Sequence, residues 1–238
     1  MRKIFNTRNL LGFVFTTFVI SIVYIIVRII LAPTVAPASD VVVRVKGDYV
    51  LMLLQCIVGV LAMLLPDFIQ HRVRIQIPSF MLIVYAIFLY CAIYLGEVRN
   101  FYHTMPHWDT ILHTFSGAAL GALGFSLVSL LNKSEKLHLS LSPLFVALFA
   151  LSFAVSLGVI WEIYEFAADS ILRTNMQKFA LEDGERLVGQ AALADTMKDL
   201  IVDMMGALAV SAIGYVSLKY KKGWLERFQL KSKTDERN

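Results

Sequence analysis

Charged side chains and cysteines are both scarce in this chain of 238 residues. Only 17% of the residues are charged and 58% are hydrophobic, and the mean hydropathy is +0.67. This composition is too apolar for a soluble domain and indicates a polytopic membrane protein. The two cysteines, Cys56 and Cys91, belong to no CxxC or Cys/His spacing, so neither a disulfide framework nor a zinc framework is expected.

The sequence also lacks an internal repeat, a low-complexity tract and a separate soluble domain. It has instead a series of long apolar runs, each near the roughly 20 residues that a helix needs to cross a bilayer. We therefore expect an all-α polytopic transmembrane helix bundle, with one integral membrane domain at 1–218 and a basic cytoplasmic tail at 219–238. The expected spans cover about residues 10–32, 49–66, 79–96, 108–131, 141–165 and 196–218.

The first apolar run follows a basic start, as in a secretory signal peptide. The apolar region of a signal peptide has about 7 to 15 residues and ends at a cleavage site with small residues, whereas the run at 10–32 is long enough to span the membrane. We expect it to remain as a spanning helix. The APTVAPAS stretch after it leaves cleavage as the alternative.

Lysine and arginine are unevenly distributed over the loops, and cytoplasmic loops carry the excess. Fourteen lie in the N-terminal segment, the loops at 67–78 and 132–140, and the tail, against six in the opposite loops. Both termini are therefore expected in the cytoplasm. The net charge of +4 comes from these cytoplasmic ends, where basic residues lie against anionic headgroups, so we expect membrane lipids and no nucleic acid as partners.

Carboxylates gather at one end of three spans, in the motifs WDTILH, WEIYEFAAD and DTMKDLIVD. The positive-charge distribution places this end on the outer side. An ionisable residue in a span is costly, and it persists where it faces a protein interior or a water-filled cavity and binds something there. Seven of the eighteen acidic residues belong to this set: Asp109, Glu162, Glu165, Asp169, Asp195, Asp199 and Asp203.

The spacing places the polar residues of each motif on one helical face, because residues three or four apart are neighbours on a helix. Asp109 and His113 form one such stripe, with His113 roughly 6 Å deeper at 1.5 Å per residue. Glycines follow in SGAALGALG and from Gly206 onward, and small residues let transmembrane backbones approach closely. We therefore expect the fourth and sixth spans to touch and the stripes to converge on one outward-facing cavity.

Clustered carboxylates need protons or a cation, because two like charges about 5 Å apart repel by roughly 3 kcal/mol at an effective dielectric constant of 20. Several carboxylates with one or two imidazoles and no thiolate suit Mg²⁺, Mn²⁺, Fe²⁺ or Zn²⁺. A divalent metal is the expected cofactor, and shared protons in a relay are the alternative. Within the spans, Arg28 and Lys198 are the candidate counter-ions.

The position of each residue in its stripe suggests a role. The expected metal ligands are Asp109, His113, Glu162 and Asp199. The expected catalytic residues, as general base or as support for the ligands, are Glu165 and Asp203. Residues expected beside the ligands or at the entrance are His103, His107, Asp169 and Asp195.

The three motifs resemble the YjdF-type family of bacterial inner-membrane proteins over roughly residues 45–218. A looser likeness to VanZ-like membrane proteins is present in the aspartate–histidine helix and the late D-xx-G helix, although Asp203 stands where that pattern has asparagine. The resemblance implies a multi-pass protein of the bacterial cytoplasmic (inner) membrane whose motif residues form the working site, and it implies no reaction. The residues that carry it are Asp109, His113, Gly117, Trp161, Glu162, Glu165, Asp195, Thr196, Asp199, Asp203, Gly206 and Ala207.

Three classes of function stay open. The first is a membrane-embedded, metal-dependent hydrolase or transferase acting on a lipid or lipid-linked phosphate, although the chain has no HExxH, nucleophile elbow or Arg-rich phosphate clamp. The second is a cation- or proton-coupled transporter or channel, although the carboxylates gather on one side and no inverted repeat is present. The third is a structural membrane protein whose polar cluster ties helices together. The sequence carries no signal for the substrate or the oligomeric state.

Overall fold

The computed structural model describes residues 6–34, 44–132, 141–181, 185–224 and 229–232 of the chain. Several basic residues counted toward the orientation lie outside these ranges, namely Arg2, Lys3, Lys133, Lys136, Arg227, Lys233 and Arg237. Residues 133–140 and much of the expected tail are therefore not part of the structural description.

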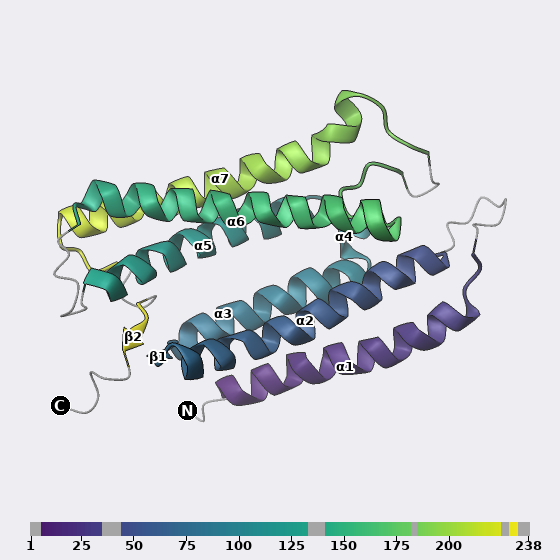
Figure 1. Ribbon diagram of the computed structural model, residues 1–238, viewed down its shortest axis with the longest axis horizontal. Coiled ribbons are helices and arrows are strands. Elements are labelled where there is room, and N and C mark those ends of the chain that lie inside the picture. The colour runs from purple at the N-terminus through teal and green to yellow at the C-terminus, as the bar shows by residue number, and fades with distance from the viewer. Residues whose placement is uncertain (1–5, 35–43, 133–140, 182–184, 225–228, 233–238) are drawn as a thin grey trace. The chain divides into compact units, whose positions relative to one another are not determined.

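Six helical segments of the described chain are long and apolar enough to cross a membrane. Beside the helices, the described residues form only two strands of two residues each, so the expected all-α polytopic architecture is confirmed (Figure 1). The elements are α1 (Thr7–Leu31), α2 (Lys46–Arg72), β1 (Ile75–Gln76), α3 (Ser79–Leu89), the π-helix η1 (Tyr90–Val98), α4 (Phe101–Thr104), α5 (Trp108–Asn132), α6 (Pro143–Leu172), α7 (Gln190–Lys219) and β2 (Lys231–Ser232).

Local sequence explains where several helices begin. The side chain of Asn6 accepts a hydrogen bond from the backbone N–H of Arg8 at 3.2 Å and caps α1. Ser142 accepts from the N–H of Phe145 at 3.2 Å, and Pro143 occupies the first position of α6, where its missing N–H is not needed. Both α6 and α7 contain 30 residues and are longer than the expected spans. The carboxylates of the second and third motifs therefore all lie within helices.

The described part of the chain divides into two compact units. Helices α2, α3, α5, α6 and α7 each contribute residues to both of them. The first unit comprises Met1–Met63, Ala86–Asp109 and Ile160–Lys198, and the second comprises Leu64–Tyr85, Thr110–Val159 and Asp199–Asn238.

In the first unit, α1, α2 and η1 pack around the fully buried Phe18. A Cβ atom on Gly59 would lie 2.6 Å from the terminal methyl of Ile93 and 3.0 Å from the ring of Phe18, so a larger residue at 59 would require the Ile93 side chain to shift. The guanidinium of Arg28 donates to the hydroxyl of Tyr49 at 3.0 and 2.8 Å. Arg28, one of the two candidate counter-ions, therefore links α1 to α2 through the hydroxyl of Tyr49.

In the second unit, α5, α6 and α7 lie side by side (Figure 1). A Cβ atom on Gly124 of α5 would lie 2.8 Å from the Cα of Ala150 on α6, so these two helices are in close contact. The buried apolar cluster between them consists of Phe125, Val128, Val146, Ala147 and Ala150.

The end of the described chain is part of the second unit and packs within it. Strand β2 pairs with β1 in antiparallel register. The N–H of Leu230 donates to the hydroxyl of Ser126 at 2.7 Å, and the N–H of Trp224 donates to Ser217 at 3.0 Å. The sequence predicts a basic tail after residue 218 but not this pairing with β1.

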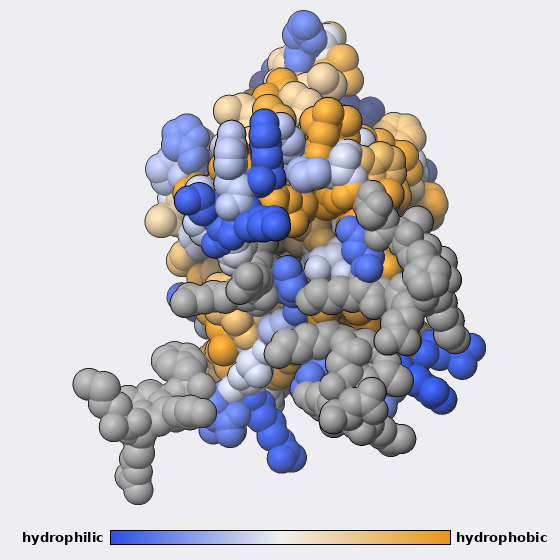
Figure 2. Space-filling model, turned by 90° about the vertical axis from the view of Figure 1, so that its left-hand side faces the viewer, coloured by the Kyte–Doolittle hydropathy of each residue, from blue (hydrophilic) through white to orange (hydrophobic). Residues whose placement is uncertain are grey.

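Large apolar side chains are exposed along the spans, among them Ile20, Ile30 and Ile163. Figure 2 shows hydrophobic and hydrophilic side chains together at the end that faces the viewer. An exposed apolar surface of this extent suits contact with lipid. The six long apolar helices and this exposed surface indicate a multi-pass membrane protein.

Candidate functional site

Helices α5 and α7 touch backbone to backbone within the second unit. A Cβ atom on Gly117 would lie 2.1 Å from the carbonyl oxygen of Asp203, and a Cβ atom on Gly206 would lie 2.1 Å from that of Thr114. No Cβ atom fits at either distance, so both positions require glycine for this approach. The expected contact between the fourth and sixth spans is confirmed.

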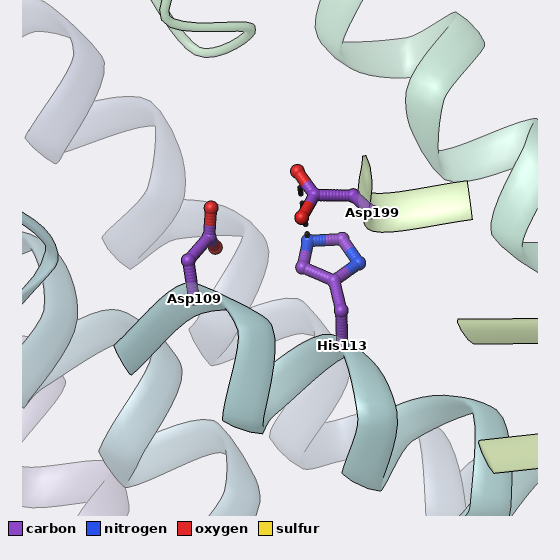
Figure 3. Close-up of side chains that lie close together, drawn as sticks. All are labelled: Asp109, His113 and Asp199. Atoms are coloured by element: carbon purple, nitrogen blue, oxygen red, sulfur yellow. Dashed lines mark ion pairs between the residues drawn. The ribbon is translucent and has the colours of Figure 1, made fainter. Parts of the chain in front are cut away.

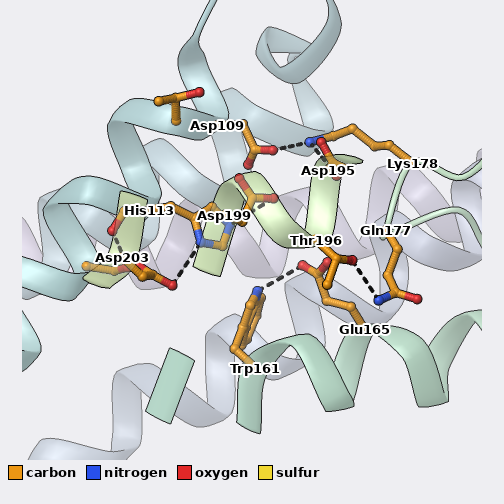
Figure 4. Close-up of polar contacts among 12 residues, drawn as sticks. Asp109, His113, Trp161, Glu165, Gln177, Lys178, Asp195, Thr196, Asp199 and Asp203 are labelled. Carbon is orange, nitrogen blue, oxygen red and sulfur yellow. Dashed lines mark hydrogen bonds and ion pairs between the residues drawn. The ribbon is translucent and has the colours of Figure 1, made fainter. Parts of the chain in front are cut away.

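This contact brings His113 of α5 between two aspartates of α7. The Nδ1 atom of His113 lies 3.2 Å from Oδ2 of Asp203, and its Nε2 atom lies 3.9 Å from Oδ2 of Asp199. Figure 4 shows the imidazole directed toward Asp203. The side chains of Asp199 and Asp203 are 3% and 6% exposed, so both carboxylates are withdrawn from solvent and lipid.

Asp203 lies where α5, α6 and α7 meet. Its Oδ1 atom accepts a hydrogen bond from the hydroxyl of Ser116 at 2.8 Å, while Oδ2 faces His113. A Cβ atom on Gly158 of α6 would lie 2.9 Å from the same Oδ2. Glycine at 158 therefore makes room for a carboxylate that α5 orients from the other side.

Asp109 extends the constellation along α5. It lies one turn before His113 on the same helix, so helix geometry alone fixes their separation. One ligand atom each from Asp109, His113 and Asp199 lies within 4.8 Å of the other two (Figure 3). These are three of the four residues expected as metal ligands.

In the first unit, the ammonium of Lys178 contacts two carboxylates, those of Asp109 and Asp195. It donates to Oδ2 of Asp109 and lies 3.5 Å from Oδ2 of Asp195 (Figure 4). The same ammonium is 5.3 Å from the ring centroid of Tyr102. Lys178 is one of the six basic residues of the outer loops, whereas the counter-ions expected within the spans were Arg28 and Lys198. Lys198 is exposed.

Asp169 folds the loop that carries Lys178. Its Oδ1 accepts from the hydroxyl of Thr174 at 2.6 Å and from the N–H of Met176 at 2.7 Å, and its Oδ2 accepts from the N–H of Gln177 at 3.0 Å. The side-chain amide of Gln177 then donates to Thr196 of α7 at 2.9 Å. Asp169 was expected beside the ligands, and its carboxylate is engaged by this loop.

The other residues expected in the site are two glutamates of α6 and two histidines near the start of α5. Glu162 and Glu165 are buried on α6, and Glu165 accepts a hydrogen bond from the indole N–H of Trp161 at 2.8 Å (Figure 4). Glu162 is not one of the three grouped ligand residues. His103 in α4 and His107 before α5 are exposed, so their part at an entrance stays a prediction.

Comparison with known proteins shows the family. Residues 11–220 match the family described as "Predicted membrane protein (DUF2238)". The chain belongs to this family. Membership of a membrane-protein family, expected from the motifs, is thereby confirmed.

A Thermotoga maritima protein described as "Uncharacterized protein" is 29% identical to this chain over 148 residues. The alignment covers 62% of this chain and 64% of that relative, so the chain spans less than two thirds of the relative's length. No solved structure matches the chain.

Proposed function

We propose that this membrane protein binds a divalent metal ion through Asp109, His113 and Asp199, with Asp203 orienting the imidazole. The observation that carries the proposal is the position of His113 between two buried aspartates. Metal-bound histidines usually donate their second ring N–H to a carboxylate, which fixes the tautomer and the ring orientation. Asp203 is placed to accept that hydrogen bond at Nδ1.

The distances around Nε2 favour a ligand role for this nitrogen. With Nδ1 donating to Asp203, Nε2 is the ring nitrogen that a metal ion would bind. Its distance of 3.9 Å from Asp199 is too long for a hydrogen bond. It is within the reach of two atoms that share one ion, since metal–ligand bonds to nitrogen and oxygen are about 2.0 to 2.2 Å.

Charge supports the same assignment. Asp199 and Asp203 are buried one turn apart on α7, and Asp109 joins them from α5. Like charges at such separations destabilise one another in a medium of low dielectric constant. A dication offsets this repulsion, and the oxygen and imidazole ligands suit Mg²⁺, Mn²⁺, Fe²⁺ or Zn²⁺.

For the activity, we favour a hydrolase or transferase acting on a lipid or lipid-linked substrate at the outer side of the bacterial cytoplasmic (inner) membrane. A bound metal would supply a hydroxide or polarise the substrate. Of the two carboxylates expected as general base, Asp203 is engaged by His113 and Ser116. Asp203 is assigned to orient the imidazole, and Glu165, which accepts a hydrogen bond from Trp161, is the proposed base.

The test is a thermal melting series in mild detergent, with EDTA, Mg²⁺, Mn²⁺, Fe²⁺ or Zn²⁺. A metal that binds only the folded protein adds about 2.7 kcal/mol of stability at a hundredfold excess over Kd. The wild type should therefore melt higher with metal and lower with EDTA, whereas Asp199→Asn should respond much less. Asp67→Asn is the matched control, because Asp67 is highly exposed on α2.

Elemental analysis of protein purified without chelator completes this test. Stoichiometric metal in the wild type and its loss from Asp199→Asn would support the proposal. If no metal copurifies and the melt ignores both metal and EDTA, the hydrogen-bonded pair of His113 and Asp203 favours proton transfer in a transporter instead.

A further inference from the structure

We infer that Lys178 is an exchangeable internal cation, which holds Asp109 until a divalent metal displaces it and which thereby sets the preference of the site for dications. The inference rests on the proposed metal site and concerns its regulation and selectivity. It assigns a task to a residue that the three acidic motifs do not contain.

Of the two carboxylates held by Lys178, Asp109 is a proposed metal ligand and Asp195 is close in sequence to another one. Asp109 lies one turn before His113 on α5, and Asp195 lies one turn before Asp199 on α7. The ammonium of Lys178 therefore holds one proposed metal ligand directly. Metal and ammonium need the same oxygens of Asp109, so the two compete.

Hydrogen bonds hold the loop around Lys178 in one conformation. The side chain of Asn175 donates to the carbonyl of Ala180 at 2.7 Å and accepts from its N–H at 3.0 Å, and Gln177 is bonded to Thr196. The backbone of Lys178 has a φ of 48°, a left-handed conformation that is uncommon for residues other than glycine. The backbone is thus fixed at the root of the side chain.

The side chain itself remains able to leave. Lysine carries a hydrated point charge on a flexible four-carbon stem, and the side chain of Lys178 is 28% exposed. Asp109 and Asp195 are 18% and 21% exposed in these pairs. Ion pairs with this access to solvent contribute little, typically about 1 kcal/mol or less, so a bound dication can replace the ammonium.

Tethering explains the selectivity. A group fixed near its binding site has an effective concentration in the millimolar range or above. A monovalent cation brings no more charge than the tethered ammonium, so it gains nothing by displacing it. A dication brings twice the charge and, in the proposed site, also binds His113 and Asp199.

The experiment measures Mn²⁺ affinity of the full chain in detergent for the wild type, Lys178→Gln, Lys178→Arg and Lys198→Gln. Removing the internal competitor should tighten Mn²⁺ binding up to about fivefold, which corresponds to roughly 1 kcal/mol. Lys178→Arg should not tighten it. Lys198→Gln is the matched control, because Lys198 is exposed on α7 and its loss changes the net charge equally.

A second set of Mn²⁺ titrations compares two buffers of equal ionic strength, one with the bulky cation N-methylglucamine and one with potassium. Potassium should weaken Mn²⁺ binding to Lys178→Gln at least threefold and leave the wild type unchanged. A third arm follows the reaction of Lys178 with an amine-specific reagent by mass spectrometry, and Mn²⁺ should accelerate it at least threefold in the wild type.

The outcomes separate the two ideas. If the wild type binds Mn²⁺ and Lys178→Gln binds it no more tightly than Lys198→Gln, the exchange is wrong while the metal site stands. The same holds if Mn²⁺ leaves the labelling of Lys178 unchanged. If neither the wild type nor Lys178→Gln binds Mn²⁺, the proposed metal site fails and the inference fails with it.

Discussion

Asp203 connects the charged residues of α7 to the imidazole of α5. Its two carboxylate oxygens divide their contacts between Ser116 and His113, and a glycine on α6 leaves room for them. At the scale of single residues, the proposed site thus depends on a side chain that would not touch the metal itself.

Asp203→Asn should therefore weaken metal binding without abolishing it. Replacing a carboxylate that orients a metal-bound histidine typically lowers affinity 10- to 100-fold, whereas Asp199→Asn removes a proposed ligand. Metal titration of both variants, with Asp67→Asn as control, measures the difference. Equal affinity for Asp203→Asn and the wild type would contradict the orienting role.

The sequence predicted the partners within each helix better than those between helices. Asp109 with His113, and Asp199 with Asp203, follow from a spacing of four residues. Lys178 could not be found in this way, because its contact with Asp109 joins residues 69 positions apart. The loop that carries Lys178 is held by hydrogen bonds to Asp169, and a helical spacing pattern does not predict these loop contacts.

At the scale of elements, the paired glycines of α5 and α7 determine how closely these helices approach. Gly117 and Gly206 each face a carbonyl oxygen of the other helix. The small residues in the sequence predicted this contact, because close backbone approach needs them. The apolar runs likewise predicted the spans, but not the π-helix η1 or the pairing of β2 with β1, which depend on contacts outside each run.

Gly206→Ala should lower the melting temperature clearly. A methyl group 2.1 Å from the carbonyl oxygen of Thr114 must push α5 and α7 apart, and overpacking of this kind typically destabilises by about 1 to 3 kcal/mol. Thermal unfolding in detergent measures the change.

Gly12→Ala provides the control for that measurement, because nothing lies within 4 Å of a Cβ atom at Gly12 in α1. Alanine favours a helix over glycine by roughly 0.5 to 1 kcal/mol, so this variant should melt at the same temperature or higher. Similar melting of both variants would contradict the close contact of α5 and α7.

For the whole molecule, the arrangement of basic residues predicts both termini in the cytoplasm and the segment around Arg186 outside. A cysteine at the exposed Arg186, in a background lacking Cys56 and Cys91, should react with a membrane-impermeant thiol reagent in intact cells. Reaction only after lysis would reverse the orientation and place the carboxylate motifs on the cytoplasmic side.

The aspartates of α7 also bear on how the chain enters the membrane during synthesis. An aspartate at the centre of a helix opposes insertion by about 2.5 to 3.5 kcal/mol, and α7 carries Asp199 and Asp203 within its length. It emerges from the ribosome after α5, which already offers His113, Ser116 and an open glycine face. The insertion of α7 is thus expected to be assisted by a helix inserted earlier, so that biogenesis and the polar site depend on the same contact.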